Sequence, residues 1–507
     1  MSAPQREGDR SLLDGFEIEI FKLVQREATL EQWREWLRAP LEHAAAKGNL
    51  DLFTRLMDAG ADGEAGWRGC DGRTLLGAAA CGKSGKMVRA LLAAGARSDV
   101  NVLFGAKRES ALHVAAGRGA EDSCKALMIA GADPNVRDSE EYSPLHRAAE
   151  AGHHGVVGIL LVKVADVDAT NDLQETPLHL AASKGHTLCI SELLLGGAGM
   201  DMIGGRGATP LSKAAVNNHL EAVAELLAAG ANSGIRDVNG YTPLEIAAIS
   251  GHATIVKAFL DKDSSSAVHA AGICGYTALH YCARTVRFGG QPVGDNGDAV
   301  RVLLKAGADV NAKTTGDAHC ETPLHLAVDH RMVSIGTIRA LLEGGANVNV
   351  RNKYEQTPLH VACSLSSYAA AVELLLRWGA DEKLTDEDGN TPEDEIGAMD
   401  DDGNNNEEIE VDNQRIRHML ARAPADRSWR RRGWLVLSRS CPTRVQIANG
   451  RNSTTSCSAK VARVNGEGSG GGGEEPEDEM MVAWRDLVGR LVGLEADGLF
   501  RLVVGFL

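Results

Sequence analysis

The chain has 507 residues, of which 44% are hydrophobic and 24% are charged. Its formal charge is −16, because 53 Lys and Arg residues stand against 69 Asp and Glu residues. Like charge repels phosphate before any contact forms, so this balance argues against a general nucleic-acid or anionic-membrane surface. The stretch from Met1 to Arg10 is polar and no run of 18 apolar residues occurs. We therefore expect neither secretion nor a membrane span.

The ten cysteines are scattered, without a Cys-x-x-Cys pair or the spacing of a disulfide framework. Such usage is typical of reduced thiols in an intracellular protein. We expect a cytoplasmic location, with the nucleus as the alternative.

A motif of about 33 residues recurs from residue 39 to residue 391. Its most regular copy reads Thr-Pro-Leu-His-Leu-Ala-Ala from Thr176 to Ala182. The Thr position is filled in successive copies by Ala39, Thr74, Ser110, Ser143, Thr176, Thr209, Thr242, Thr277, Thr322, Thr357 and Thr391. A period of this length indicates a repeat array, in which each unit packs on its neighbours and no single centre exists.

The residue types within one copy predict a pair of helices. Thr176 is a helix cap, and Pro177 suits the first helical position, where a missing N–H costs nothing. Gly185 permits the sharp turn to a second helix, and Gly197 ends that helix in the left-handed conformation. The polar residues that follow predict a hairpin-like finger before the next copy.

The pattern Thr-Pro-Leu-His-x-Ala-Ala, followed by Gly-Ala-Asp-x-Asn, resembles the ankyrin repeat. The best copies begin at Ser143, Thr176, Thr322 and Thr357, and the run from Gly307 to Asn311 matches the start of a finger. The resemblance implies an all-α dominated solenoid of helix-turn-helix units with short β-hairpin fingers, used to hold other proteins.

We divide the chain into five parts. They are a helical N-terminal cap over residues 1–38, an array of about ten repeats over 39–399, a degenerate capping repeat and basic helix over 400–439, a flexible linker over 440–478, and an amphipathic C-terminal helix over 479–507. The tail is therefore expected to be partly disordered. Two questions stay open: whether the C-terminal helix docks on the array or binds a partner, and what the eighth-repeat insertion near Phe288 does.

Two further segments have competing interpretations. Gly77 to Ser84 matches the letters of a phosphate-binding loop, but the repeat register places it in a first helix, where the N–H groups are already bonded. The basic, aromatic stretch from Arg427 to Arg439 either packs on the preceding helix, directs nuclear import or binds an acidic partner.

The 16 histidines raise the question of a metal site. Ten of the 16 histidines fall on two repeat positions, six in Thr-Pro-Leu-His and four in the turn. We interpret them as hydrogen-bonding framework, and we predict no metal, no cofactor and no catalytic residue.

The positions that the repeat leaves free are the finger tips and the exposed side of the first helices. We predict that a protein partner contacts them, and that aromatic and Arg side chains contribute most. The candidates are Glu140, Glu141, Tyr142, Arg147, Lys184, Arg236, Asn239, Lys353 and Tyr354. The sequence and the resemblance thus favour a non-enzymatic, monomeric intracellular scaffold or adaptor that binds a protein partner on the concave ankyrin face. A nucleotide-binding enzyme using Gly77–Ser84 and a nuclear regulatory protein using Arg427–Arg439 are the alternatives.

Overall fold

The computed structural model describes residues 41–58, 72–163, 165–262, 266–284, 295–315, 319–329, 334–364, 369–396 and 410–424. The expected N-terminal cap, the insertion near residue 288 and everything after residue 424 lie outside the described residues, and with them the basic stretch, the linker and the C-terminal helix. Two units, residues 1–318 and 319–507, are described separately.

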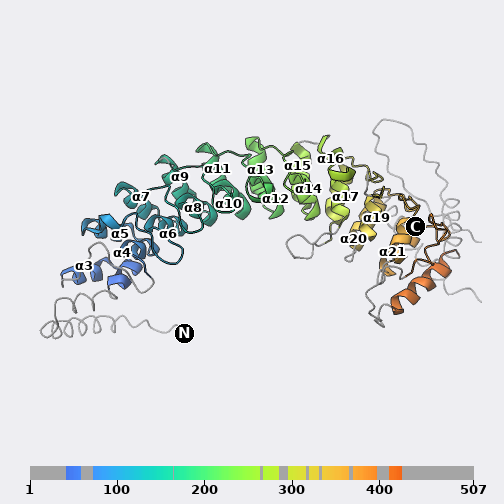
Figure 1. Cartoon of the computed structure of the whole chain (residues 1–507), viewed down its shortest axis with the longest axis horizontal. Coiled ribbons are helices and arrows are strands. Elements are labelled where there is room, and N and C mark those ends of the chain that lie inside the picture. Colours follow the sequence, from blue (N-terminus) through green and yellow to red (C-terminus); the bar gives the residue numbers. More distant parts are fainter. Residues whose placement is uncertain are drawn as a thin grey trace, which may run out of the picture. The chain divides into compact units, whose positions relative to one another are not determined.

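The first unit consists of helix pairs arranged in two layers (Figure 1). The first helices are α4 (Leu75–Cys81), α6 (Ala111–Arg118), α8 (Pro144–Ala151), α10 (Pro177–Lys184), α12 (Pro210–Val216), α14 (Pro243–Ile249) and α17 (Ala278–Ala283). The second helices are α3 (Leu50–Asp58), α5 (Gly85–Ala93), α7 (Glu121–Ile129), α9 (His154–Val162), α11 (Thr187–Leu195), α13 (Leu220–Ala229), α15 (Ala253–Lys262) and α18 (Gly297–Lys305). Between them lie a helix over residues 41–47, the four-residue α16 (Ser266–His269) and the 3₁₀ turns η1 (Ala96–Asp99), η2 (Gly205–Gly207) and η3 (Ile273–Gly275).

Each first helix starts where the sequence predicts. The hydroxyl of Thr176 accepts a hydrogen bond from the N–H of His179, and Pro177 occupies the first helical position. The same side-chain cap recurs at Thr74, Ser110, Ser143, Thr209 and Thr242. The cap satisfies an N–H that would otherwise have no partner, so it fixes the helix start in these copies.

The core lies between the two layers and between successive repeats. Leu178, Ala181 and Ala182 of α10 are fully buried, as are Ile190 and Leu193 of α11. Small Ala side chains let neighbouring first helices approach closely, while Leu and Ile fill the space between the layers. The low aromatic content of the chain follows from this division.

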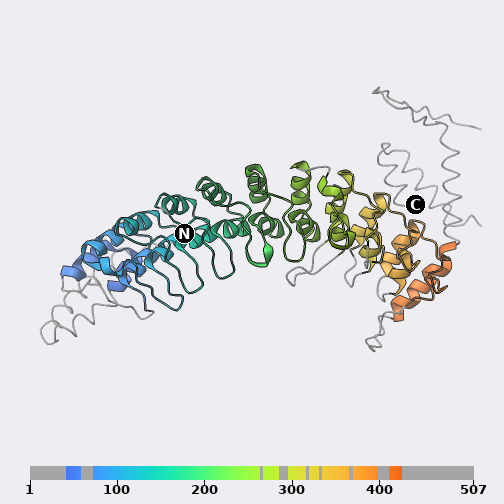
Figure 2. The ribbon, with the colours of Figure 1, turned by 45° about the horizontal axis from the view of Figure 1, so that its top comes forward.

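The fingers project from one side of the helix layers (Figure 2). At the base of one finger, the side chain of Asp138 accepts the N–H groups of Glu140 and Tyr142 at 2.9 and 3.0 Å, and its own N–H donates to the Tyr142 carbonyl. Asn171 and Asp237 make the same three bonds in later fingers. These fingers are therefore closed by a side chain.

The expected β-hairpins are shorter than strands. Within the described residues no strand forms, and the one isolated bridge joins Phe104 and Glu109. A finger such as the one at Asp138 has a single pair of opposed backbone groups, which is too few for a ladder. Successive fingers are instead joined through their tips, where Ser139 donates to the Lys107 carbonyl at 2.8 Å and Val238 to the Arg206 carbonyl at 3.1 Å.

The second unit repeats this pattern in α19 (Pro323–Val328), α20 (Ile335–Glu343), α21 (Pro358–Ser364) and α22 (Ala369–Arg377), followed by a helix over residues 410–424. Ile416 and Leu420 of that last helix are buried. The finger tips are joined as in the first unit, since Lys353 donates its N–H to the His319 carbonyl at 2.7 Å.

The glycine that ends α10 offers a test of the fold. Gly185 has φ of +74°, and a Cβ there would lie 2.5 Å from Nδ1 of His219. We expect Gly185→Ala to lower the free energy of unfolding by about 2 kcal/mol, measured by urea denaturation, because backbone strain and the clash act together.

Gly117→Ala in α6 is the matched control. Gly117 lies inside a helix, and the nearest atom to an added Cβ is 3.7 Å away. Alanine there should be neutral or slightly stabilising, since Ala is the better helix former. Equal losses in the two variants would contradict this explanation.

Candidate protein-binding surface

Histidine rings connect each first helix to the next finger. Nδ1 of His146 lies 3.1 Å from the backbone N–H of Ser143, and Nε2 lies 3.0 Å from the carbonyl of Glu175, just before the next helix. His113, His179, His280, His325 and His360 occupy the same place. Because the cap N–H is a donor, Nδ1 must accept, so the network assigns the proton to Nε2.

The second set of histidines connects turns in the opposite direction. Nε2 of His153 lies 3.2 Å from the Gly117 carbonyl, one repeat earlier, and His186, His219 and His252 bond the carbonyls of Glu150, Ser183 and Val216. The predicted framework role of both sets is confirmed. Among the residues that the structure describes, no group of His, Cys, Asp and Glu is arranged to hold a metal ion.

Burial of four rings of the first set, His113, His146, His179 and His360, disfavours their charged form. It lowers the pKa of His146 to about 4 and also lowers the pKa of His113, His179 and His360, against the smaller opposite effect of the carbonyl hydrogen bonds. These four rings are therefore neutral at pH 7, as their hydrogen bonds require.

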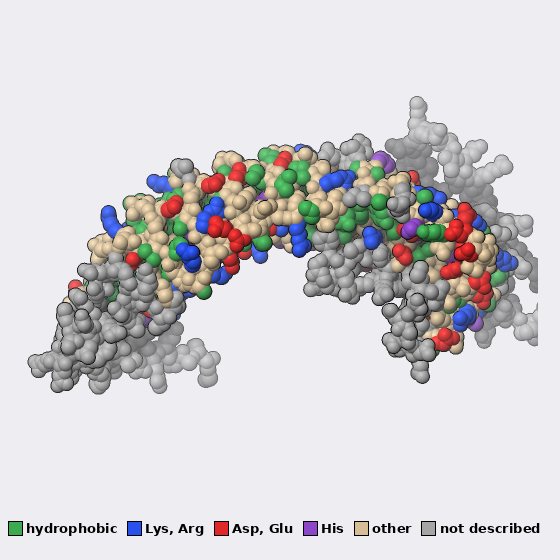
Figure 3. Space-filling view, viewed as in Figure 1, with side chains coloured by type: hydrophobic (Ala, Val, Ile, Leu, Met, Phe, Trp, Pro, Cys, Tyr) green, Lys and Arg blue, Asp and Glu red, His purple; other side chains and the backbone are tan. Residues whose placement is uncertain are grey.

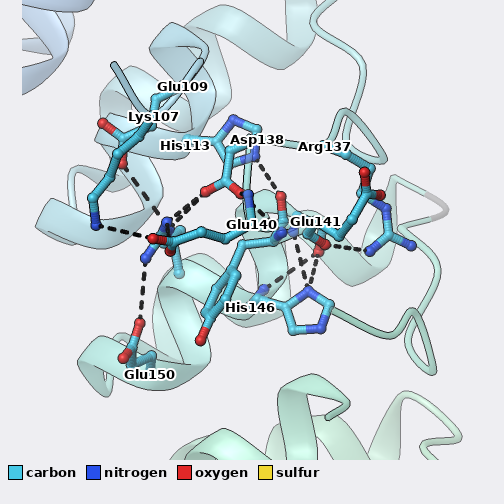
Figure 4. A network of polar contacts seen from close by, with 12 residues as sticks. Lys107, Glu109, His113, Arg137, Asp138, Glu140, Glu141, His146 and Glu150 are labelled. Atoms are coloured by element: carbon cyan, nitrogen blue, oxygen red, sulfur yellow. Dashed lines mark hydrogen bonds and ion pairs between the residues drawn. The ribbon is translucent and has the colours of Figure 1, made fainter. Parts of the chain in front are cut away.

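Arg147 of α8 is the centre of an ionic network at the base of a finger. Figure 4 labels the carboxylates of this network, Glu109, Asp138, Glu140 and Glu150. The Arg147 guanidinium lies 2.5 Å from Asp138, 3.2 Å from Glu140 and 3.6 Å from Glu150, and it stacks 4.2 Å from the ring centre of Tyr142. Arg147 also lies 4.0 Å from Glu109, and Lys107 lies 3.9 Å from Glu140. Carboxylates from two fingers and one helix therefore meet at one cation.

The network brings three of the sequence candidates together, Glu140, Tyr142 and Arg147, and Glu141 lies at the same finger tip. Their exposure indicates different roles. The side chain of Arg147 is only 14% exposed, while that of Glu140 is 49% exposed. Glu141 is exposed at the tip with φ of +57°, and its carbonyl accepts a 2.8 Å hydrogen bond from Arg137. Arg147 therefore holds the finger in place, and Glu140 and Glu141 face outward.

A second cluster lies at the finger before α14. Arg236 pairs with the buried Glu245 at 3.0 Å, and the Asn239 amide is bonded to Asp237. Three tyrosines that the sequence reasoning did not single out gather beside this pair. Tyr281 lies 5.1 Å from Tyr241 and 5.3 Å from Tyr276, ring centre to ring centre. Burial raises the pKa of Tyr281, so its hydroxyl stays protonated.

The remaining candidates lie apart from these clusters. Lys184 is exposed at the end of α10. In the second unit Lys353 is exposed, and the hydroxyl of Tyr354 lies 2.9 Å from Nδ1 of His319 on the preceding finger. Tyr354 thus joins two fingers and keeps part of its ring accessible.

Three consecutive fingers of the first unit carry exposed aliphatic side chains. Leu173 is 61% exposed, Ile203 62% and Val238 69%. Charged residues of both signs lie beside one another on the face of this unit seen in Figure 3. Rigid fingers therefore present isolated apolar groups within a mixed-charge surface.

The phosphate-loop letters form part of an ordinary repeat. Gly77 lies in α4 and donates its N–H to the Thr74 hydroxyl at 3.0 Å, while the Gly82 and Lys83 N–H groups donate to helix carbonyls. A Cβ on Gly77 would meet the ring of Phe104, so this glycine serves close packing. These backbone donors are not free to wrap a phosphate.

The buried thiols also have a structural role. Burial raises the pKa of Cys124 to about 12 and that of Cys189 to about 11. Both stay protonated at pH 7 and lack the thiolate that a nucleophile needs.

Comparison with known proteins decides the family. A family model described as ankyrin repeats matches overlapping segments from residue 41 to residue 386. The chain belongs to the ankyrin repeat family. The matched residues include the Thr-Pro-Leu-His helices and the fingers described above.

Similar curated proteins share only the repeats. The chain is 36% identical over 92 residues to the E3 ubiquitin-protein ligase KEG of Arabidopsis thaliana, which is 18% of the chain and 5% of that protein. It is 35% identical over 133 residues to the Neurogenic locus Notch protein of Drosophila melanogaster, which is 25% of the chain and 5% of that protein. It is 42% identical over 88 residues to the mouse B-cell lymphoma 3 protein homolog, which is 17% of the chain and 18% of that protein.

These partial matches support protein interaction as the general role of the repeats, without naming a partner. In the part of the chain that the structure describes, no helix has both the length and the apolar character needed to cross a membrane.

The buried histidines predict acid sensitivity. Because the pKa of His146 is lower in the folded state, the unfolded chain binds the proton first, so stability is fully present above pH 6.5 and is lost as the pH falls towards 4. Preferential protonation of His146 in the unfolded chain should by itself reduce the free energy of unfolding by about 2 kcal/mol between pH 7 and pH 5. Urea midpoints measured across this range test the prediction.

His146→Gln, which cannot titrate, is the control. Its midpoint should be lower at pH 7, where the ring's hydrogen bonds are lost, and should fall less steeply with pH than that of the natural chain. Parallel pH profiles for the two proteins would contradict the assignment of a neutral ring.

Proposed function

We propose that this chain is a non-enzymatic scaffold or adaptor whose protein partner lies across the fingers and the exposed side of the first helices. One observation carries the proposal: three consecutive fingers with fixed backbones expose Leu173, Ile203 and Val238. Exposed apolar side chains on neighbouring fingers can contribute apolar contact area to an interaction site.

Fixed fingers favour binding because little conformational freedom remains to be lost. Asp138, Asn171 and Asp237 close their fingers with two backbone hydrogen bonds each, and Val238 is also tied to the preceding finger. A preorganised surface avoids part of the ordering cost of association.

The charges around the aliphatic groups supply selectivity. Glu140, Glu141 and Arg236 are exposed on the fingers and Lys184 is exposed at the end of α10, so the exposed charges carry both signs. A partner with a complementary pattern is favoured, and like charges in the wrong register are repelled. Tyr142, Arg147 and Asn239 complete the proposed contact set of the first unit, with Arg147 acting mainly by holding its finger. In the second unit, taken by itself, Lys353 and Tyr354 are the proposed contacts.

The chemistry of the described surface supports binding over catalysis in this proposal. The recurring histidines, the buried thiols and the Gly77 segment all have framework roles, so none is left to act on a substrate. We propose a cytoplasmic location. The nuclear alternative rests on the basic sequence from Arg427 to Arg439, outside the described residues.

Affinity capture with the full chain tests the contact surface. We expect the triple substitution Leu173→Ser, Ile203→Ser and Val238→Ser to reduce the recovered partner at least about tenfold, because each side chain loses the apolar area it buries on binding. The side chains are exposed, so helix content by circular dichroism should not change.

Val238→Ser and Val411→Ser form a matched pair, since Val411 is 63% exposed in the helix over residues 410–424. The first should weaken capture and the second should not. Recovery of the same partners in the same amounts by the triple variant would show that the fingers do not bind them.

A further inference from the structure

A buried tyrosine in the first unit has an unused hydrogen-bonding group. Tyr281 of α17 is only 5% exposed. Its ring contacts Tyr241 and Tyr276, but within the described residues its hydroxyl makes no hydrogen bond and no ion pair. The hydroxyl of a buried tyrosine ordinarily has a partner, because it loses its hydrogen bonds to water. A group that supplies one is therefore favoured beside Tyr281.

The repeat register explains why this hydroxyl has no partner. Tyr281 stands four residues after the cap of its helix, as Arg147 does in α8. Five residues before the cap of α8 stands Asp138, whose carboxylate pairs with Arg147. Gly272 has the Asp138 position in the repeat of α17, and a Cβ on it would lie 3.1 Å from the Tyr281 hydroxyl. The side-chain partner that this position supplies in α8 is replaced by a glycine.

The carboxylate of Glu245 reaches the same place from the preceding repeat. Its side chain is 3% exposed, and Oε2 lies 2.8 Å from the Thr242 N–H and 3.0 Å from Arg236. Oε1 has no hydrogen bond within the described residues, and it lies 3.2 Å from the position of a Cβ on Gly272. Two buried oxygens from successive repeats therefore meet beside Gly272 with unused hydrogen-bonding capacity.

The charges at this place favour an uncharged ligand group. Nη1 of Arg236 lies 3.3 Å from the same Cβ position, and its hydrogens are directed at the Gly240 carbonyl and at Glu245. A cation placed there would be repelled by Arg236, and an anion would be repelled by Glu245. The fitting group is neutral, with a donor for Oε1 and an acceptor for the Tyr281 hydroxyl.

We propose that Glu245 and Tyr281 bind the carboxamide of an Asn or Gln side chain presented by the protein partner. The carboxamide N–H donates to Oε1 of Glu245, and its oxygen accepts from the Tyr281 hydroxyl. A carboxamide carries this donor and this acceptor side by side without charge. The proposal rests on the proposed function, because it assigns one partner side chain to that surface. Val238, 69% exposed on the finger that carries Arg236, extends the contact.

A peptide library displayed on phage tests the chemistry directly. Peptides selected on the full chain, after depletion on its Tyr281→Phe variant, should share an Asn or Gln at one position. Fluorescence polarisation should show that Ala, Ser or Glu at that position weakens binding at least about tenfold, because buried polar groups lose their partner. Tyr281→Phe should weaken the amide peptide by a similar factor and leave the affinity of the Ala peptide unchanged, since both changes remove one hydrogen bond.

Two further variants sharpen the test. Gly272→Ala places a Cβ between the two oxygens, so it should also weaken the amide peptide at least about tenfold. Tyr241→Phe is the matched control, because the Tyr241 hydroxyl is not among the nearest atoms to that Cβ. It should leave binding unchanged.

Stability separates a peptide ligand from an ordered water. Tyr281→Phe removes no hydrogen bond, so the urea midpoint should not fall. A lower midpoint would show that water already satisfies the hydroxyl, and it would overturn the proposal. A selection without enrichment of Asn or Gln would do the same, as would an amide peptide that binds the Tyr281→Phe variant unchanged. These results would leave the proposed function standing, since the triple serine variant tests the fingers separately.

Discussion

One interaction connects the repeats of this protein, and it is made by a neutral histidine ring. Its Nδ1 accepts a hydrogen bond from the N–H of the residue that caps its own helix, and its Nε2–H donates one to the carbonyl just before the next first helix. It fixes the helix start and the neighbouring finger with one side chain. Because both bonds require the neutral ring, the structure depends on keeping these rings out of water. This hydrogen bond also fixes the positions of the exposed residues on the finger, because they would move if the finger moved.

Some repeats lack this connection: Gly77 stands in the histidine position of α4, and the two consecutive repeats of α12 and α14 also have other residues there. Ser212 and Glu245 stand in the histidine position and still bond their caps, but Glu245 pairs with Arg236 of its own finger. Glycines at 204 and 272 replace the Asp or Asn that closes other fingers. A Cβ on Gly272 would lie 3.1 Å from the Tyr281 hydroxyl, so the change makes room for the tyrosine cluster.

The period, the caps and the histidines could be predicted from sequence because they recur, and recurrence reveals what stacking demands. The sequence reasoning did not predict that the side chain of Asp138 closes its finger by hydrogen bonds, although Asp or Asn recurs at that position. The environment of Arg147 could not be predicted, because Glu109, Asp138 and Glu150 come from separate elements and meet only in the fold. The exposure of Ile129, Val162 and Leu195 could not be predicted, because apolar residues at the ends of second helices have the same sequence pattern as core residues.

The central claim is that a partner protein covers the fingers. Hydrogen–deuterium exchange of the full chain, alone and with a captured partner, tests it most directly. We predict slower exchange at the finger tips around Glu140, Leu173 and Val238 and on the exposed side of the first helices, with the outer ends of α7, α9 and α11 unchanged by the partner. Protection confined to the second helices or to residues after 424 would contradict it.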